Sequence, residues 1–217
     1  MGATWVILAV MAGCNAQNKV EPAGVATEAA VEPVAEAPVD EGTAIPTRGD
    51  DAERASKNGE LSHAFGDATV VVRYGKPTVK GRTIFGDLVP YGRVWRTGAN
   101  EASVFATDAD LTVEGQPLPK GVYGLFTVPG EEEWTVIFNG NAEQWGAGEY
   151  DAAKDALRVA VKPEAAEASE AFDVQATETG IVMRWAEVAV PVSIAAAAAD
   201  AAPEGEAAPA DAEERTD

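Results

Sequence analysis

The chain has 217 residues, with 36 Asp and Glu against 16 Lys and Arg, and its formal net charge at pH 7 is −20. Such a charge opposes binding to nucleic acid through bulk electrostatics. A single Cys, Cys14, and a single His, His63, exclude an intrachain disulfide and the paired Cys or His ligands of zinc sites. We therefore expect no nucleic-acid partner, no metal and no cofactor.

The first 14 residues resemble a bacterial lipoprotein signal peptide. Residues 4–13 are an apolar run (T-W-V-I-L-A-V-M-A-G), about half of the ~20 residues that span a bilayer. Met11-Ala12-Gly13-Cys14 resembles the lipobox, which implies cleavage before Cys14 and acylation of its thiol. The acyl chains would hold the protein on the lipid bilayer of the cell envelope, at its periplasmic or outer-membrane face. The alternative is a buried N-terminal strand with an incidental cysteine.

Two segments are predicted to be disordered, residues 15–60 and residues 195–217. Ala, Glu, Pro, Val and Gly dominate the first segment, and large side chains are rare in it. This composition cannot bury enough apolar surface to offset chain entropy. The second segment repeats the pattern and is strongly acidic, with two prolines that oppose a helix. We expect residues 15–60 to tether a single domain of residues 61–194 to the anchor.

Alternating apolar side chains recur between these segments, which predicts half-buried strands. The clearest runs are 69–74, 134–139, 157–162, 172–176, 181–185 and 188–194. Residues 118–129 carry large side chains on both faces, as a central strand does. Hairpin turns are predicted at Glu114-Gly115, Pro129-Gly130 and Thr179-Gly180.

Two interruptions are predicted in this pattern. Pro191 indicates an edge strand or a bulge, because it cannot donate to a sheet ladder. Residues 150–155 favour one or two helical turns. About nine strands with almost no helix predict an all-β fold, a single antiparallel β-sandwich of jelly-roll or immunoglobulin-like type. We expect this domain to be a monomer.

The run K-G-R-T-I-F-G-D-L-V-P-Y-G-R-V-W-R-T-G-A-N-E, residues 80–101, is the most distinctive part of the domain. Between Arg73 and Arg96 there are six basic residues and one acid, Asp87, in an otherwise acidic chain. Guanidinium groups and Gly-rich backbone can hold a carboxylate or a phosphate. The sequence thus predicts a site for a small anionic ligand or an envelope saccharide. Its candidate ligand-binding residues are Lys80, Arg82, Tyr91, Arg96, Asn100, Glu101 and Trp145.

Three alternatives stand beside this prediction. Arg96 and Glu101 could pair with each other while Asn100 caps a turn, so that the run only fastens a loop. Asp87 and Glu101 could act as the acid and base of a hydrolase acting on saccharides, although the sequence makes catalysis the less favoured reading. The domain could also be a purely structural envelope component.

The aromatic residues divide by their surroundings. Trp134 and Trp185 alternate with apolar positions and are predicted to be core, whereas Trp145 lies in an irregular Gln-Trp-Gly turn and is predicted at a rim. Trp95 is left open. His63, at the start of the domain, is predicted to be a surface or hydrogen-bonded side chain.

Residues 62–194 resemble domain of unknown function 2911, a bacterial family frequent in secreted and lipid-anchored proteins. The resemblance rests on the run at 80–102, L-P-K-G-V-Y-G-L-F-T-V-P-G at 118–130, E-W-T-V-I-F-N at 133–139, Q-W-G at 144–146 and Y-D-A-A-K-D-A-L-R-V at 150–159. The family has no established activity, so the resemblance implies no catalytic residue. The expected function is that of an envelope lipoprotein with a non-catalytic binding or interaction domain.

Overall fold

Alternation of buried and exposed side chains gives each long strand one face in a common core. In β2 (Ala68–Lys76), Val70, Val72 and Tyr74 are buried, while Val71 and Arg73 between them remain partly exposed. The structure is a computed structural model that describes residues 44–197. The expected signal peptide with Cys14, residues 15–43 of the expected tether and nearly all of the expected acidic tail lie outside the described residues.

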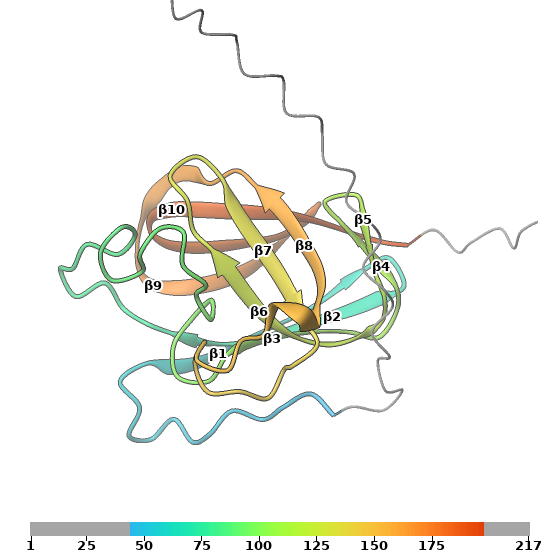
Figure 1. Cartoon of the computed structure of the whole chain (residues 1–217), viewed down its shortest axis with the longest axis horizontal. Coiled ribbons are helices and arrows are strands. Elements are labelled where there is room, and N and C mark those ends of the chain that lie inside the picture. Colours follow the sequence, from blue (N-terminus) through green and yellow to red (C-terminus); the bar gives the residue numbers. More distant parts are fainter. Residues whose placement is uncertain (1–43, 198–217) are drawn as a thin grey trace, which may run out of the picture. The chain divides into compact units, whose positions relative to one another are not determined.

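Ten antiparallel strands in residues 44–197 form two sheets (Figure 1). The larger sheet has the order β1 (Lys57–Phe65), β2, β3 (Ser103–Thr107), β6 (Gly121–Val128), β7 (Trp134–Asn139) and β8 (Asp155–Val161). The smaller sheet has the order β5 (Gln116–Leu118), β4 (Leu111–Val113), β10 (Gly180–Ala196) and β9 (Glu164–Thr177). The sheets pack together, so the predicted all-β sandwich is confirmed.

Several local predictions are confirmed and some are refined. Glu114 and Gly115 both have positive φ and form the turn between β4 and β5. The predicted central strand is β6, which lies between β3 and β7, but it begins only at Gly121. A short 3-10 helix, η1 (Ala152–Lys154), accounts for the expected helical turns.

The two strands predicted at 181–185 and 188–194 are one strand, β10. A register shift around Ala186, whose φ is +50°, bends this strand without ending it. Pro191 lies between the part of β10 that pairs with β9, up to Ala189, and the part that pairs with β4, from Ile194. Its missing N–H therefore costs no ladder hydrogen bond.

The predicted domain boundary at residue 61 is corrected to residue 57 or earlier. β1 begins at Lys57, and residues 44–56, here called the N-terminal segment, run along the outside of the sheet beside β1 (Figure 1). β1 is an edge strand whose side chains are mostly exposed, so its sequence lacks the alternation that marks a half-buried strand. The N-terminal segment is held by charged side chains, a feature that a hydrophobicity pattern does not reveal.

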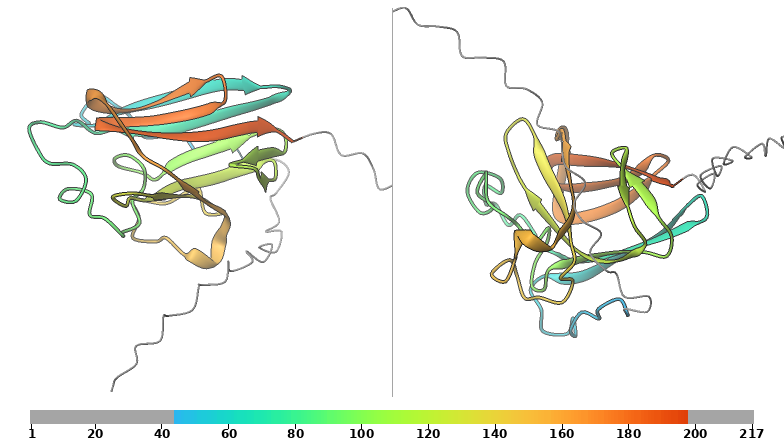
Figure 2. Two further views of the ribbon diagram at one scale, coloured as in Figure 1. Left: turned by 90° about the horizontal axis from the view of Figure 1, so that it is seen from above. Right: turned by 45° about the vertical axis from the view of Figure 1, so that its right-hand side comes forward.

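The distinctive run 80–101 belongs to the long connection between β2 and β3, residues 77–102. This connection lies at the end of the sandwich opposite β4 and β5 (Figures 1 and 2). It contributes three buried side chains, Ile84, Val89 and Trp95, to the core. Trp95 stacks on Trp185 of β10 with ring centroids 5.7 Å apart and an interplanar angle of 18°. Three large apolar residues of this run therefore serve to pack the core.

None of the helices in residues 44–197 is long and apolar enough to cross a membrane.

Candidate functional site

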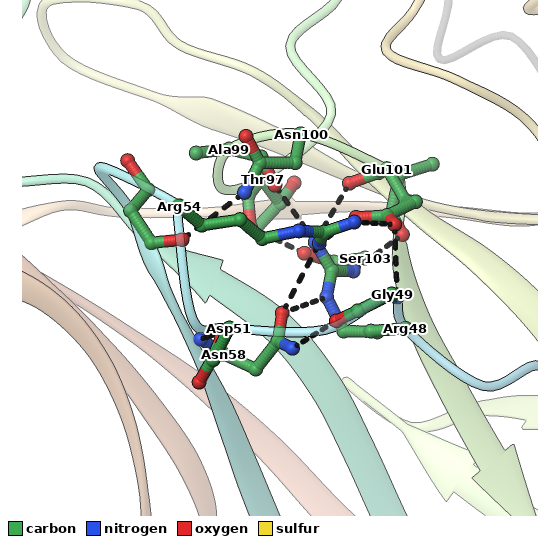
Figure 3. A network of polar contacts seen from close by, with 12 residues as sticks. Arg48, Gly49, Asp51, Arg54, Asn58, Thr97, Ala99, Asn100, Glu101 and Ser103 are labelled. Carbon is green, nitrogen blue, oxygen red and sulfur yellow. Dashed lines mark hydrogen bonds and ion pairs between the residues drawn. The ribbon is translucent and has the colours of Figure 1, made fainter.

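A charged network around Glu101 fastens the N-terminal segment to the sandwich (Figure 3). Arg54 donates from Nη1 to Glu101 Oε2 at 2.7 Å and from Nη2 to Oε1 at 2.6 Å, a bidentate pair. Arg48 Nη2 lies 3.2 Å from Oε2, and the Gly49 N–H donates to Oε1 at 3.2 Å. Each carboxylate oxygen of Glu101 therefore already has two partners. We call these residues, together with Asn58, the Glu101 network.

Arg48 is the most deeply placed member of the Glu101 network, with a side chain that is 5% exposed. Its Nε donates to Asn58 Oδ1 at 3.1 Å, its Nη1 to the Ala102 carbonyl at 3.0 Å and its Nη2 to the Ala99 carbonyl at 2.7 Å. All three guanidinium nitrogens are thus used within the protein. Desolvation by burial lowers the pKa of Arg48, while Glu101 opposes this effect.

The electrostatics of Glu101 follow from these contacts. Hydrogen bonds from Arg54, with smaller contributions from the Gly49 N–H and the charge of Arg48, lower the pKa of Glu101 from 4.5 to about 2 although burial opposes the shift. Glu101 is therefore ionised at neutral pH. It has no free lone pair and no raised pKa, which a general acid would need.

A pocket of about 360 Å³ opens next to the Glu101 network. Its lining residues come from the N-terminal segment, from the start of β3 and from the loop between β7 and η1: Pro46, Thr47, Arg48, Glu101, Ala102, Val104, Ala142, Glu143, Gln144 and Trp145. We call it the Trp145 pocket. Ala102 and Val104 are 1% and 2% exposed, so they form its apolar floor on the outer face of the larger sheet.

The loop that carries Trp145 is tied to β3 through its backbone. The Ala102 N–H donates to the Gln144 carbonyl at 3.0 Å, and Glu101 and Trp145 form an isolated antiparallel bridge. These contacts hold the Trp145 backbone while its side chain remains 66% exposed. An indole ring presented in this way is available for stacking.

Two acceptor groups of the pocket lining, the Glu143 carboxylate and the Gln144 side-chain oxygen, have no partner among residues 44–197. The Glu143 side chain makes no hydrogen bond or ion pair, and the residue is exposed. Gln144 is 7% exposed; its Nε2 donates to the Asn141 carbonyl at 2.9 Å, but its buried Oε1 accepts no hydrogen bond. Both free groups are hydrogen-bond acceptors.

Of the residues proposed from sequence, the structure brings Glu101 and Trp145 together and leaves the other five outside the pocket lining. Arg82 donates to the carbonyls of Thr78 and Val79, and Asn100, with φ of +65°, donates to the Ser56 carbonyl. Lys80 and Tyr91 are exposed. Asn100 and Glu101 thus fasten the N-terminal segment, whereas the loop-fastening alternative expected Glu101 to pair with Arg96 and Asn100 to cap a turn.

Arg96 neither lines the pocket nor pairs with Glu101, the two roles expected for it from the sequence. Its buried Nε has no hydrogen-bond partner in the described part of the chain. Desolvation lowers the pKa of Arg96, and its charge also lowers that of Arg48. The two guanidinium groups therefore repel each other, and Glu101 pairs with Arg48 and Arg54 but not with Arg96.

The remaining candidates are distributed over the surface and core. Asp87 is exposed and does not line the Trp145 pocket. Trp134 and Trp185 are core, as predicted, and Trp95, which the sequence left open, is core as well. His63 is an exposed side chain, with its ring 4.8 Å from that of Phe65.

Sequence reasoning missed Arg48 and Arg54, because both fall in the segment expected to be a tether. A signal was present: these two guanidinium groups stand 6 residues apart in an otherwise acidic stretch. It also missed the unpartnered Glu143 and Gln144, which flank Trp145 directly. Residues 44–197 contain no group of three or more His, Cys, Asp or Glu side chains placed to hold a metal ion.

The fold and the pocket define a class: an all-β sandwich with a small ligand-sized pocket on the outer face of its larger sheet. The family model described as "Protein of unknown function (DUF2911)" matches residues 56–194, and the chain belongs to this family. No curated protein and no solved structure matches the chain.

Proposed function

We propose that the protein is a non-catalytic binding module of the cell envelope that holds a saccharide in the Trp145 pocket. The observation that carries this proposal is the exposed indole of Trp145 beside an apolar floor and free polar groups. Sugars have apolar ring faces that stack on aromatic side chains and hydroxyl groups that need hydrogen-bond partners. A pocket of about 360 Å³ is within the usual range for small ligands.

Between the two ligand classes expected from the sequence, the geometry favours the saccharide over the small anion. The only guanidinium in the pocket lining, that of Arg48, already uses its three nitrogens and is almost fully covered. An anion would have to displace Glu101 or backbone carbonyls to reach it. A stacked sugar needs no such displacement.

No specific observation favours the hydrolase or the purely structural component. The hydrolase needs a carboxyl with a raised pKa, whereas the pKa of Glu101 is lowered to about 2 and its oxygens are occupied. A purely structural component needs no pocket beside residues 80–101, whereas Glu101 lines one. The lipid anchor at Cys14, and with it the envelope location, remains part of the proposal on the strength of the lipobox resemblance.

Binding to insoluble envelope glycans tests this function. The full-length chain in detergent is incubated with purified peptidoglycan and with a soluble panel of neutral, amino and acidic oligosaccharides, and retained protein and affinities are measured. Trp145→Ala should weaken binding about fivefold or more, because stacking on an aromatic ring is worth on the order of 1 kcal/mol or more.

Tyr91→Ala is the matched control, because Tyr91 is also an exposed aromatic, at 41%, but lies outside the pocket lining. It should bind like the unmodified protein. Equal loss in both variants, or no binding of any glycan by the unmodified protein, would contradict the proposed function.

A further inference from the structure

The charged group and the buried polar atom that the lining of the Trp145 pocket leaves unpaired are both acceptors. The carboxylate of Glu101 accepts hydrogen bonds from Arg54 and the Gly49 N–H and forms an ion pair with Arg48, so both of its oxygens are engaged. Glu143 and Gln144 Oε1 have no partner among residues 44–197. The nitrogens of Arg48, which would be the donors, are used within the protein.

The charge of the pocket lining also favours a cationic ligand. Among the lining residues, the charges of Arg48 and Glu101 offset each other, which leaves the exposed carboxylate of Glu143 as the uncompensated charge of the lining. The exposed indole of Trp145, the next residue but one, offers the negative face of its ring. A carboxylate and an aromatic face in the lining of one pocket favour a cationic ligand.

Gln144 supplies a second, independent indication. The residue is 7% exposed, and burying a carbonyl oxygen with no hydrogen-bond donor is unfavourable. Its Nε2 is held by the Asn141 carbonyl, which sets the direction of the amide. A ligand N–H or O–H that reached Oε1 after a small turn of the Gln144 side chain would remove this cost, whereas a carboxylate or phosphate would add a further unpaired acceptor.

We propose that the Trp145 pocket selects a glycan unit with a free ammonium group, an amino sugar that is not N-acylated, over its N-acylated and acidic counterparts. The ammonium group pairs with Glu143 and lies against the Trp145 ring, while a neighbouring hydroxyl donates to Gln144 Oε1. This specificity rests on the proposed saccharide-binding function. It also reverses the sign of the ligand charge expected from the sequence.

Calorimetric titration with three defined oligosaccharides tests the proposed specificity for an ammonium group. The full-length chain in detergent is titrated at pH 6 with a tetramer of glucosamine, a tetramer of N-acetylglucosamine and a tetramer of galacturonic acid. We expect the glucosamine tetramer to bind roughly tenfold more tightly than the N-acetylated one, and the acidic tetramer to bind most weakly, because one exposed ion pair with a cation–π contact contributes on this scale.

Two charge-matched variants separate the pocket from the overall acidity of the chain. Glu143→Gln should reduce the preference for the glucosamine tetramer over the N-acetylated one to less than about threefold. Glu132→Gln removes the same charge from an exposed position in the loop between β6 and β7, outside the pocket, and should keep the preference.

The outcomes test the ammonium specificity separately from the proposed saccharide-binding function. Equal affinities for the three tetramers, all dependent on Trp145, would overturn the ammonium specificity and leave saccharide binding intact. A preference that persists in Glu143→Gln would overturn it as well. Failure of all three tetramers together with the neutral glycans would contradict the proposed function itself.

Discussion

At the scale of single residues, the carboxylate of Glu101 is shared by two guanidinium groups of the N-terminal segment. It joins the N-terminal segment to the start of β3 through Arg54, Arg48 and the Gly49 N–H. Its carboxylate is 24% exposed and the Arg48 side chain only 5%, so removing the carboxylate would leave a buried guanidinium without its counter-charge. Glu101 therefore acts on the Trp145 pocket by holding one of its walls in place.

This role predicts a pH-dependent loss of stability. The lowered pKa means that ionised Glu101 stabilises the folded state above about pH 4.5, and that this contribution disappears as the pH falls towards about 2. The shift corresponds to about 3 kcal/mol, and partial exposure reduces it to about 2 kcal/mol. Glu101→Gln should lose about this amount at pH 7 and should show a flatter stability profile between pH 4.5 and 2, measured by urea unfolding.

Glu60→Gln provides the comparison, because Glu60 pairs with Arg73 at 2.7 Å but is 54% exposed. Its loss should cost less than about 1 kcal/mol. Similar losses in the two variants would show that the Glu101 network contributes no more than an ordinary surface ion pair.

At the scale of elements, the connection of residues 77–102 between β2 and β3 closes one end of the sandwich. Trp95 is 8% exposed, stacks on Trp185, and donates from Nε1 to the Gly98 carbonyl at 3.2 Å. The returning chain passes so close to β2 that a Cβ added at Gly75 would collide with the Ala99 carbonyl oxygen. Glycine at position 75 thus permits the packing that places Glu101 at the start of β3.

This packing predicts a large cost for Trp95→Ala. Truncating a buried tryptophan leaves a cavity and should destabilise the domain by about 3–5 kcal/mol, with loss of the near-ultraviolet circular dichroism that two stacked indoles produce. Tyr91→Ala, in the same connection but 41% exposed, should change stability by no more than about 0.5 kcal/mol. A cost below 1 kcal/mol for Trp95→Ala would show that the connection is not part of the core.

At the scale of the whole molecule, the N-terminal segment links the proposed anchor to the proposed binding site. Pro46, Thr47 and Arg48, which form one wall of the Trp145 pocket, stand immediately after the part of the tether that lies outside the described residues. In the proposed arrangement, the chain that leads from the lipid at Cys14 ends as part of the ligand site. The net charge of −20 would then keep the rest of the protein away from an anionic bilayer surface.

Lipid attachment has a direct prediction. Metabolic labelling with palmitate should mark the protein in a bacterial host, and Cys14→Ser should abolish the label and release the protein from the membrane fraction, because several acyl chains are needed for stable anchoring. The fold of residues 44–197 should be unaffected, as judged by an unchanged thermal unfolding midpoint. Absence of label from both forms would contradict the lipid anchor.

The sequence determined the class of the fold and many of its parts. Alternating apolar residues indicated the strands around Val72, Val136 and Val174, and Glu114-Gly115 indicated a hairpin, because strand period and turn chemistry are local properties of the chain. The family resemblance was readable from the same residues and is confirmed over residues 56–194. Trp145 was correctly expected to be exposed, since no apolar neighbours surround it in sequence.

Only the tertiary structure decided which polar groups meet. Glu101 lies 47 residues from Arg54 and pairs with it, while Arg96, only 5 residues away, does not. Ion pairs and pocket walls depend on how strand order brings distant segments together, and no local pattern carries that information. In the fold, the run 80–101 contributes Trp95, which packs against Trp185 at the end of the sandwich. The pocket lies instead on the outer face of β3, where the N-terminal segment and Trp145 line it.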